Sequence, residues 1–249
     1  MIVIDLQNVS KTFRDNGTAV EALADVTFQV QAGEFVTLIG PSGSGKSTIF
    51  NLITGLIEPD TGTVRVHNEP PRSGTVGYMP QRDLLLPWRT VVGNAIIPLE
   101  IAGMPREQAQ QRARDMLPTF GLEGFADAYP ASLSGGMRQR TALLRTMLTD
   151  ADTLLFDEPF GALDALTRRA LQDWLLDLWR GMEKTILFVT HDVEEALYLG
   201  DRVLVLSARP GRIEHTQTVE FSRPRERKMM ADPAFGRQLT DLLSALGIE

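Results

Sequence analysis

A glycine-rich segment of the chain reads Gly40-Pro41-Ser42-Gly43-Ser44-Gly45-Lys46-Ser47-Thr48 and fits the pattern G-x-x-x-x-G-K-[S/T]. It lies between an apolar run over 35–39, which we expect to be a strand, and residues 46–55, where apolar side chains recur at helical spacing. Glycines let such a loop curl so that its backbone N–H groups face phosphate oxygens, and the following helix N-terminus adds partial positive charge. The alternative is a glycine-rich turn with an incidental lysine. The flanking elements favour a phosphate-binding loop.

A second segment, Thr153–Pro159, is an apolar run that ends in Asp157 and Glu158. A strand of a parallel sheet would deliver these carboxylates to the carboxyl edge of the sheet, beside the phosphate loop. There Lys46 would reach the β- and γ-phosphates of a nucleotide, and Ser47 and Asp157 would hold Mg²⁺. Glu158 would polarise the attacking water. Taken alone, the segment also fits a helix-capping Asp-Glu pair after a core strand.

Strand-like and helical segments alternate along the chain, which predicts an α/β fold with a parallel sheet and right-handed crossovers. Helical periodicity covers most of 91–149 and returns over 165–182. The other predicted strands are 2–9, 26–30, 63–66, 76–78, 153–156, 186–189 and 203–206. A turn signal at Asn16-Gly17 separates the first two of them. We expect three parts: a nucleotide-binding core from residues 1–82 and 150–220, an inserted helical subdomain over 83–149, and a C-terminal helical tail over 221–249.

Composition excludes several classes of protein. The 249 residues are 43% hydrophobic and 23% charged, which is ordinary for a globular protein and argues against disorder. The net charge of −7 argues against a general nucleic-acid binder, and the absence of cysteine excludes disulfides and thiolate metal sites. The N-terminus shows no signal-peptide pattern and no apolar run is long enough to span a bilayer. We therefore expect a soluble protein of a reducing compartment.

A third segment narrows the choice among phosphate-loop proteins, which include GTPases, kinases and helicases. Leu133-Ser134-Gly135-Gly136-Met137-Arg138-Gln139-Arg140 opens a helix shortly before the strand that ends in Asp157. It resembles the signature motif of the ATP-binding cassette (ABC) family, although Met137 stands where glutamine is most common. The glycines let the helix N-terminus approach an anion, and Ser134 suits the N-cap. A plain loop followed by an N-cap is the alternative for the segment alone.

The resemblance covers about residues 1–220 and implies roles for further residues. Gln81 matches the Q-loop residue, which senses Mg²⁺ and the γ-phosphate. Gly161-Ala162-Leu163-Asp164 matches the D-loop, which contacts the opposite subunit, and His191 matches the switch histidine. Phe13 matches the aromatic that stacks on adenine, with a core phenylalanine on an antiparallel strand as the alternative. The implied fold is a P-loop NTPase (RecA-like) ABC cassette, with an N-terminal antiparallel β-subdomain and an inserted α-helical subdomain.

Two further segments, Leu84–Val91 and Ser207–Ile213, look like those of the ATPase subunits of bacterial nitrate/sulfonate/taurine-type importers. Related cassettes for pyrimidine precursors or riboflavin look much the same. Trp88, beside Pro87, is interpreted either as a core residue or as an exposed anchor for a permease. The basic run over 223–228 is expected to be a solvated loop, with a lipid-headgroup or permease contact as the alternative.

The resemblance implies an ATP-binding and ATP-hydrolysing subunit of a bacterial importer that takes up a small anion or organic solute. Its implied cofactors are ATP and Mg²⁺. Its implied partners are a second copy of the chain, a separate transmembrane permease docked near Pro87 and Trp88, and a periplasmic solute-binding protein, with no nucleic acid. The two copies would sandwich ATP head to tail between one phosphate loop and the partner's Ser134 loop, peripherally on the cytoplasmic face of the inner membrane. The alternatives are the ATPase of an exporter, a soluble non-transport ABC ATPase and a non-hydrolysing regulator.

Overall fold

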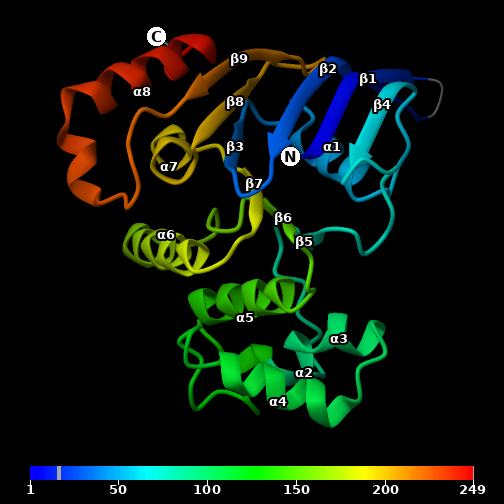
Figure 1. The fold of residues 1–249 in the computed structure, drawn as a ribbon, viewed down its shortest axis with the longest axis vertical. Coiled ribbons are helices and arrows are strands. Elements are labelled where there is room, and N and C mark those ends of the chain that lie inside the picture. The colour runs from blue at the N-terminus through cyan, green and yellow to red at the C-terminus, as the bar shows by residue number, and fades with distance from the viewer. Residues whose placement is uncertain (16–17, 249) are drawn as a thin grey trace.

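The computed structural model describes residues 1–15 and 18–248, so the predicted turn at Asn16-Gly17 lies outside the described residues. Its strands form two sheets (Figure 1), a three-stranded antiparallel sheet in the order β2-β1-β4 and a six-stranded sheet in the order β5-β6-β7-β3-β8-β9. The six-stranded sheet is parallel except for β9, which pairs antiparallel with β8. The strands are β1 (Ile2–Asp15), β2 (Thr18–Gln31), β3 (Phe35–Ile39), β4 (Thr61–Val66), β5 (Gly77–Met79), β6 (Thr153–Asp157), β7 (Thr185–Val189), β8 (Arg202–Leu206) and β9 (Ile213–Thr218).

Helices cover the six-stranded sheet and continue below it (Figure 1). They are α1 (Lys46–Ile53), α2 (Val91–Ala95), α3 (Ile97–Ile101), α4 (Arg106–Met116), α5 (Gly135–Met147), α6 (Ala165–Arg180), α7 (Val193–Leu199) and α8 (Pro233–Ala245), with 3₁₀ turns η1 (Pro130–Ser132) and η2 (Arg227–Ala231). The sheet separates two apolar cores. Val36 and Leu38 of β3 pack with α1 and the three-stranded sheet, whereas Phe35 and Ile39 pack in the core on the other face, with α6 and α7. This alternation is what the period-2 geometry of a strand requires.

The first hairpin is longer than the sequence predicts, since the predicted strands 2–9 and 26–30 cover only part of β1 and β2. The additional pairs include Phe13 opposite Val20. Most residues of this outer part are polar and at least partly exposed, so no alternation of apolar residues marks it. The strand β9 was missed for the same reason, because its side chains alternate only between partly buried and exposed.

Helices α2 to α5 form a separate layer below the sheets, connected to them through β5 and β6 (Figure 1). The loop that follows Gln81 is fastened to this layer. The buried Asn94 side chain accepts from the Leu86 N–H and donates to backbone carbonyls, including that of Leu86. Arg145 of α5 donates to the backbone carbonyls of Asp83 and Leu84. A movement of this loop would therefore be transmitted directly to α2 and α5.

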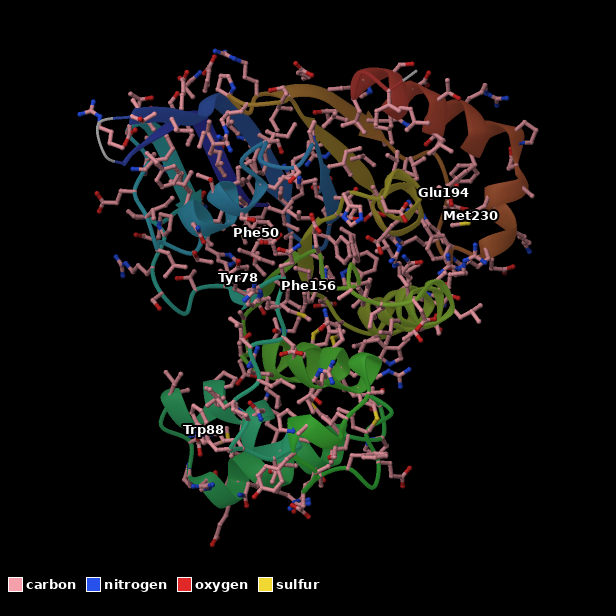
Figure 2. The ribbon with its side chains drawn as sticks, turned by 180° about the vertical axis from the view of Figure 1, so that it is seen from behind. Phe50, Tyr78, Trp88, Phe156, Glu194 and Met230 are labelled. Carbon is pink, nitrogen blue, oxygen red and sulfur yellow. The ribbon has the colours of Figure 1, made fainter. Side chains whose placement is uncertain are left out.

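The arginines of the C-terminal basic run contradict the expectation of a solvated loop, although Lys228 is exposed. Arg225 is buried and donates to the Leu197, Tyr198 and Gly200 carbonyls at the end of α7. Arg223 lies over the ring of Trp179, with its guanidinium carbon 4.3 Å from the ring centroid. Figure 2 shows Met230 of η2 near Glu194 of α7, and both residues line one small cavity of about 120 Å³. Arg223 and Arg225 instead anchor the tail to the end of α7, and the lipid-headgroup alternative is wrong for the buried Arg225.

Within the described ranges, no helix is both long and apolar enough to cross a membrane.

Candidate active site

Four loops of the candidate site leave the same edge of the six-stranded sheet, because β5, β6, β7 and β3 are parallel neighbours. The phosphate loop follows β3, Gln81 follows β5, Asp157 ends β6, and His191 follows β7. Loops at the carboxyl ends of adjacent parallel strands converge at one place. The fold therefore places four residues or segments that are far apart in the sequence at one edge.

The phosphate loop curls as its glycines allow. Gly43 and Gly45 have φ angles of 76° and 103°, which favour glycine, and Gly45 is the N-cap of α1. The Lys46 ammonium donates to the backbone carbonyls of Gly40 (2.8 Å) and Pro41 (2.9 Å). Burial lowers the pKa of Lys46, while the negative charges of Glu158 and Asp157 act in the opposite direction. The Lys46 side chain thus folds back on the phosphate loop and is bound to two of its backbone carbonyls.

A cleft of about 310 Å³ opens above the loop, lined by Phe13, Val20, Ala22, residues 42–48, Gln81, Asp157, Glu158 and Arg209. A larger groove, of about 610 Å³, lies elsewhere, between the end of α1 and β4. That groove holds none of the predicted site residues, so the smaller, polar cleft is the candidate site.

Ser47 and Asp157 meet inside the cleft, where the Ser47 hydroxyl donates to Asp157 Oδ2 at 3.0 Å. Burial raises the pKa of the Asp157 carboxyl, opposed by this hydrogen bond. Burial, followed by the nearby Asp157 charge, raises the pKa of the Tyr78 phenol to about 12. A hydroxyl and a carboxylate oxygen are the hard donors that Mg²⁺ takes from proteins, while it retains several waters. The residues present therefore fit a magnesium ion bound with a nucleotide.

Glu158 is the centre of a polar cluster at the mouth of the cleft. Its Oε2 accepts a hydrogen bond from Gln81 Nε2 at 3.1 Å and lies 3.1 Å from Nδ1 of His191. Its backbone has a φ of 46° and its N–H donates to the Val189 carbonyl at 2.9 Å. Positive φ is uncommon outside glycine and is often found at functional sites. The fold thus brings together three residues expected to act in catalysis.

Phe13 lies on a wall of the cleft and not in the apolar core. Its side chain is 42% exposed and lines the cleft beside Val20. The alternative that made it a core phenylalanine is therefore wrong. An exposed ring on the wall of a polar cleft is available to stack on a planar group.

The signature and D-loop residues do not line this cleft. The Ser134 hydroxyl caps α5 by accepting from the Met137 N–H at 3.2 Å. Asp164 caps α6, and its hydrogen bonds to Thr167 and Leu166 lower the pKa of its carboxyl. A Cβ added to Gly136 would lie 3.0 Å from Thr167, so the first turns of α5 and α6 are packed against each other. Ser134, Gly135, Gly136 and Asp164 therefore form a second surface, separate from the phosphate loop of the same chain.

Comparison with known proteins identifies the family. The family model described as ABC transporter matches residues 23–161, more than half of the chain. The chain belongs to the ABC transporter family. The resemblance of the Ser134 and phosphate-loop motifs to this family is thereby confirmed.

Relatives and solved structures agree with this assignment. An uncharacterised ABC transporter ATP-binding protein of Methanocaldococcus jannaschii is 42% identical, over 97% of this chain and 91% of that protein. The formylaminopyrimidine import ATP-binding protein ThiZ of Halalkalibacterium halodurans is 44% identical (84% and 81%), and the taurine import ATP-binding protein TauB of Yersinia pestis is 42% identical (89% and 90%). The dimeric post-hydrolysis structure of the cassette MJ0796 bound to ADP and phosphate superposes with a TM-score of 0.78 at 32% identity, over 88% of this chain and all of that one. The expected ABC cassette fold is confirmed.

Arg168 was not predicted as a site residue, although it contacts both the D-loop and the loop that carries His191. Arg168 of α6 donates to the carbonyls of Phe160 (3.3 Å) and Leu163 (2.9 Å). Its guanidinium also lies 3.8 Å from the Asp192 carboxylate, next to the switch histidine. In the sequence it is one of two consecutive arginines on a helix, and nothing in that pattern distinguishes it from a solvated charge.

Proposed function

We propose that this chain is the ATP-binding and ATP-hydrolysing subunit of an importer, peripheral on the cytoplasmic face of the inner membrane. The convergence of Gln81 and His191 on Glu158, at the mouth of a phosphate-loop cleft, is the observation that supports hydrolysis. The names of ThiZ and TauB support import, and a small anion or organic solute such as a sulfonate is the proposed cargo. The transmembrane permease and periplasmic binding protein of such a system are the proposed partners.

The proposed mechanism begins with binding. Phe13 stacks on the base, and the amides of residues 42–48 and Lys46 hold the phosphates. Ser47, Asp157 and Gln81 would hold Mg²⁺ with the nucleotide. Bound Mg²⁺ would neutralise charge on the β- and γ-phosphates. These contacts orient the γ-phosphate toward Glu158.

Glu158 then accepts a proton from a water as the water oxygen bonds to the γ-phosphorus and the bond to the ADP oxygen breaks. His191 contacts the γ-phosphate from its place beside Glu158. Glu158 accepts a hydrogen bond from Gln81, so a change at the γ-phosphate would reach the loop that follows Gln81. This loop is bound to Arg145 of α5 through the carbonyls of Asp83 and Leu84.

Two copies of the chain are proposed to complete the site. Ser134, Gly135, Gly136 and Asp164 do not line the cleft of their own chain, and all four are at least partly exposed. A head-to-tail dimer would place this surface over the partner's phosphate loop. The dimeric state of the solved MJ0796 cassette supports that arrangement.

The test of the proposed function is phosphate release from ATP by the purified full-length chain. We expect release that requires Mg²⁺ and is abolished in Lys46→Ala, which removes the cation from the phosphate loop. Phosphate release by Lys46→Ala at the rate of the unmodified chain would contradict the assignment of the cleft. If the unmodified chain released phosphate from none of the nucleotides, the proposed hydrolysis would be contradicted.

Trp88 provides the test of coupling to transport. Trp88 is 71% exposed, so the core alternative is wrong. Figure 2 shows it on the helical layer, away from Phe50 of α1 and Tyr78 of β5. Seated in a pocket of the permease, it would contribute about 2 kcal/mol or more to docking. Trp88→Ala should abolish uptake and substrate-stimulated hydrolysis in the assembled complex, while the isolated chain melts as before.

The control for Trp88 is Leu56→Ala, which truncates another exposed apolar residue, 66% exposed, outside the helical layer. It should leave uptake unchanged. Normal uptake with Trp88→Ala, or an equal loss with Leu56→Ala, would refute docking through Trp88.

A further inference from the structure

The loop between β8 and β9 is built against the phosphate loop. The Ser207 hydroxyl accepts from the Arg212 N–H at 2.9 Å, which closes the loop on itself. Gly211 bonds to β2 on both sides, donating to the Ala22 carbonyl (2.9 Å) and accepting from the Ala24 N–H (3.0 Å). Ala22 also lines the nucleotide cleft. The loop is therefore fixed to one wall of the cleft by its backbone.

Gly211 also brings the loop into direct contact with the phosphate loop. A Cβ at this position would overlap the backbone oxygen of Ser44, and no side chain could be accommodated there without moving one of the two loops. Only glycine permits so close an approach of the two backbones. The distance between the loops is thus set by the fold.

This contact places the side chain of Arg209 on the cleft. Its Nε donates to the carbonyl of Gly43 at 3.2 Å, and its Nη2 would lie 3.1 Å from a Cβ at Gly43. Arg209 lines the same cleft as Lys46 and Phe13. Across residues 1–15 and 18–248, its guanidinium forms no ion pair with a carboxylate. Within the described part of the chain, Nε is the one guanidinium nitrogen of Arg209 with an acceptor, so Nη1 and Nη2 are available to a ligand.

We propose that Arg209 is a nucleotide-binding residue whose guanidinium contacts a phosphate group of the bound nucleotide. The proposal rests on the proposed ATP site and adds a second cation to the one that Lys46 supplies. An unpaired guanidinium beside backbone amides that face a phosphate offers charge-assisted hydrogen bonds. Lys46 is committed to the Gly40 and Pro41 carbonyls until a nucleotide binds, whereas Arg209 is already directed into the cleft.

The test compares Arg209→Gln and Arg209→Lys with Arg212→Gln, measuring ATP affinity of the full-length chain by titration at two salt concentrations. Arg212 is exposed on the same loop and does not line the cleft. Arg212→Gln therefore changes the net charge of the chain as Arg209→Gln does, but leaves the cleft unaltered. Arg209→Gln should weaken ATP binding about tenfold or more, as loss of a charged hydrogen bond predicts. Arg209→Lys, which keeps the charge, should recover most of the affinity, and Arg212→Gln should bind ATP like the unmodified chain.

Two further readouts separate a phosphate contact from a purely structural brace on Gly43. The nucleotide-free melting temperature of Arg209→Gln should match that of the unmodified chain, and its ATP affinity should depend less on salt, because one charge contact is missing. ATP affinity equal in Arg209→Gln and Arg212→Gln would overturn the proposal. So would an equal loss in Arg209→Gln and Arg209→Lys, since that would assign the effect to the bond with Gly43. If the unmodified chain bound no ATP, the proposed function would fail instead.

Discussion

Replacing Glu158 with glutamine should lower ATP hydrolysis by at least about 10²-fold, the contribution of a positioned general base. Nucleotide binding should survive, because the phosphate loop and the Ser47–Asp157 pair are untouched. A glutamine side chain keeps the shape of Glu158 and can still accept the hydrogen bond from Gln81, but it takes no proton from water. Steady-state phosphate release and ATP titration on the same preparation measure the two effects separately.

The control for this variant is Glu214→Gln, which neutralises an exposed carboxylate on β9, away from the cleft. It should hydrolyse ATP at the normal rate. Because the Glu158→Gln protein binds ATP without consuming it, ATP should also shift it to a dimer in size-exclusion chromatography. Near-normal turnover of Glu158→Gln would remove Glu158 from the role of base.

Arg225→Met should destabilise the fold by about 3 kcal/mol, because it leaves buried carbonyls at the end of α7 without donors. The Arg225 side chain is 1% exposed and bonds to three of those carbonyls. Burial lowers its pKa to about 10, so the charge is retained at neutral pH. For a chain of this size, 3 kcal/mol corresponds to a fall of roughly 6–12 °C in melting temperature.

Lys228→Met removes the same charge from the same tail and is the matched control. Lys228 is 81% exposed and pairs only with its neighbour Glu226 among the described residues. Its replacement should alter the free energy of unfolding by no more than about 0.5 kcal/mol. Equal melting temperatures for Arg225→Met and Lys228→Met would show that the tail is not anchored through Arg225.

Local motifs predicted the parts of the site that depend on short-range geometry. The phosphate loop needs only its glycines and its lysine between a strand and a helix, and Asp157 needs only to end a buried strand. Their convergence followed from the parallel sheet, whose strand ends meet at one edge. The roles of Gln81 and His191 came from resemblance, since a single glutamine or histidine after a strand has no chemical meaning by itself.

Other features depend on tertiary contacts that leave no periodic signal in the sequence. The outer part of β1 and β2 is stabilised by a backbone ladder with polar side chains, so hydrophobic alternation did not mark it. Arg225 and Arg209 look alike in the sequence, as arginines in polar loops. One is buried under α7 and the other lines the cleft, because the chain returns to distant elements after β8. Only the folded structure distinguishes such residues.

This chain is proposed to hydrolyse ATP at a site shared between two copies. The most direct test of the shared site is the rate of phosphate release per chain, measured against protein concentration with saturating ATP and Mg²⁺. We predict a rate per chain that rises with concentration and reaches a plateau, because the phosphate loop of one copy needs the Ser134 surface of another. A rate per chain that stays constant from the lowest concentration, with the protein monomeric throughout, would contradict the shared site.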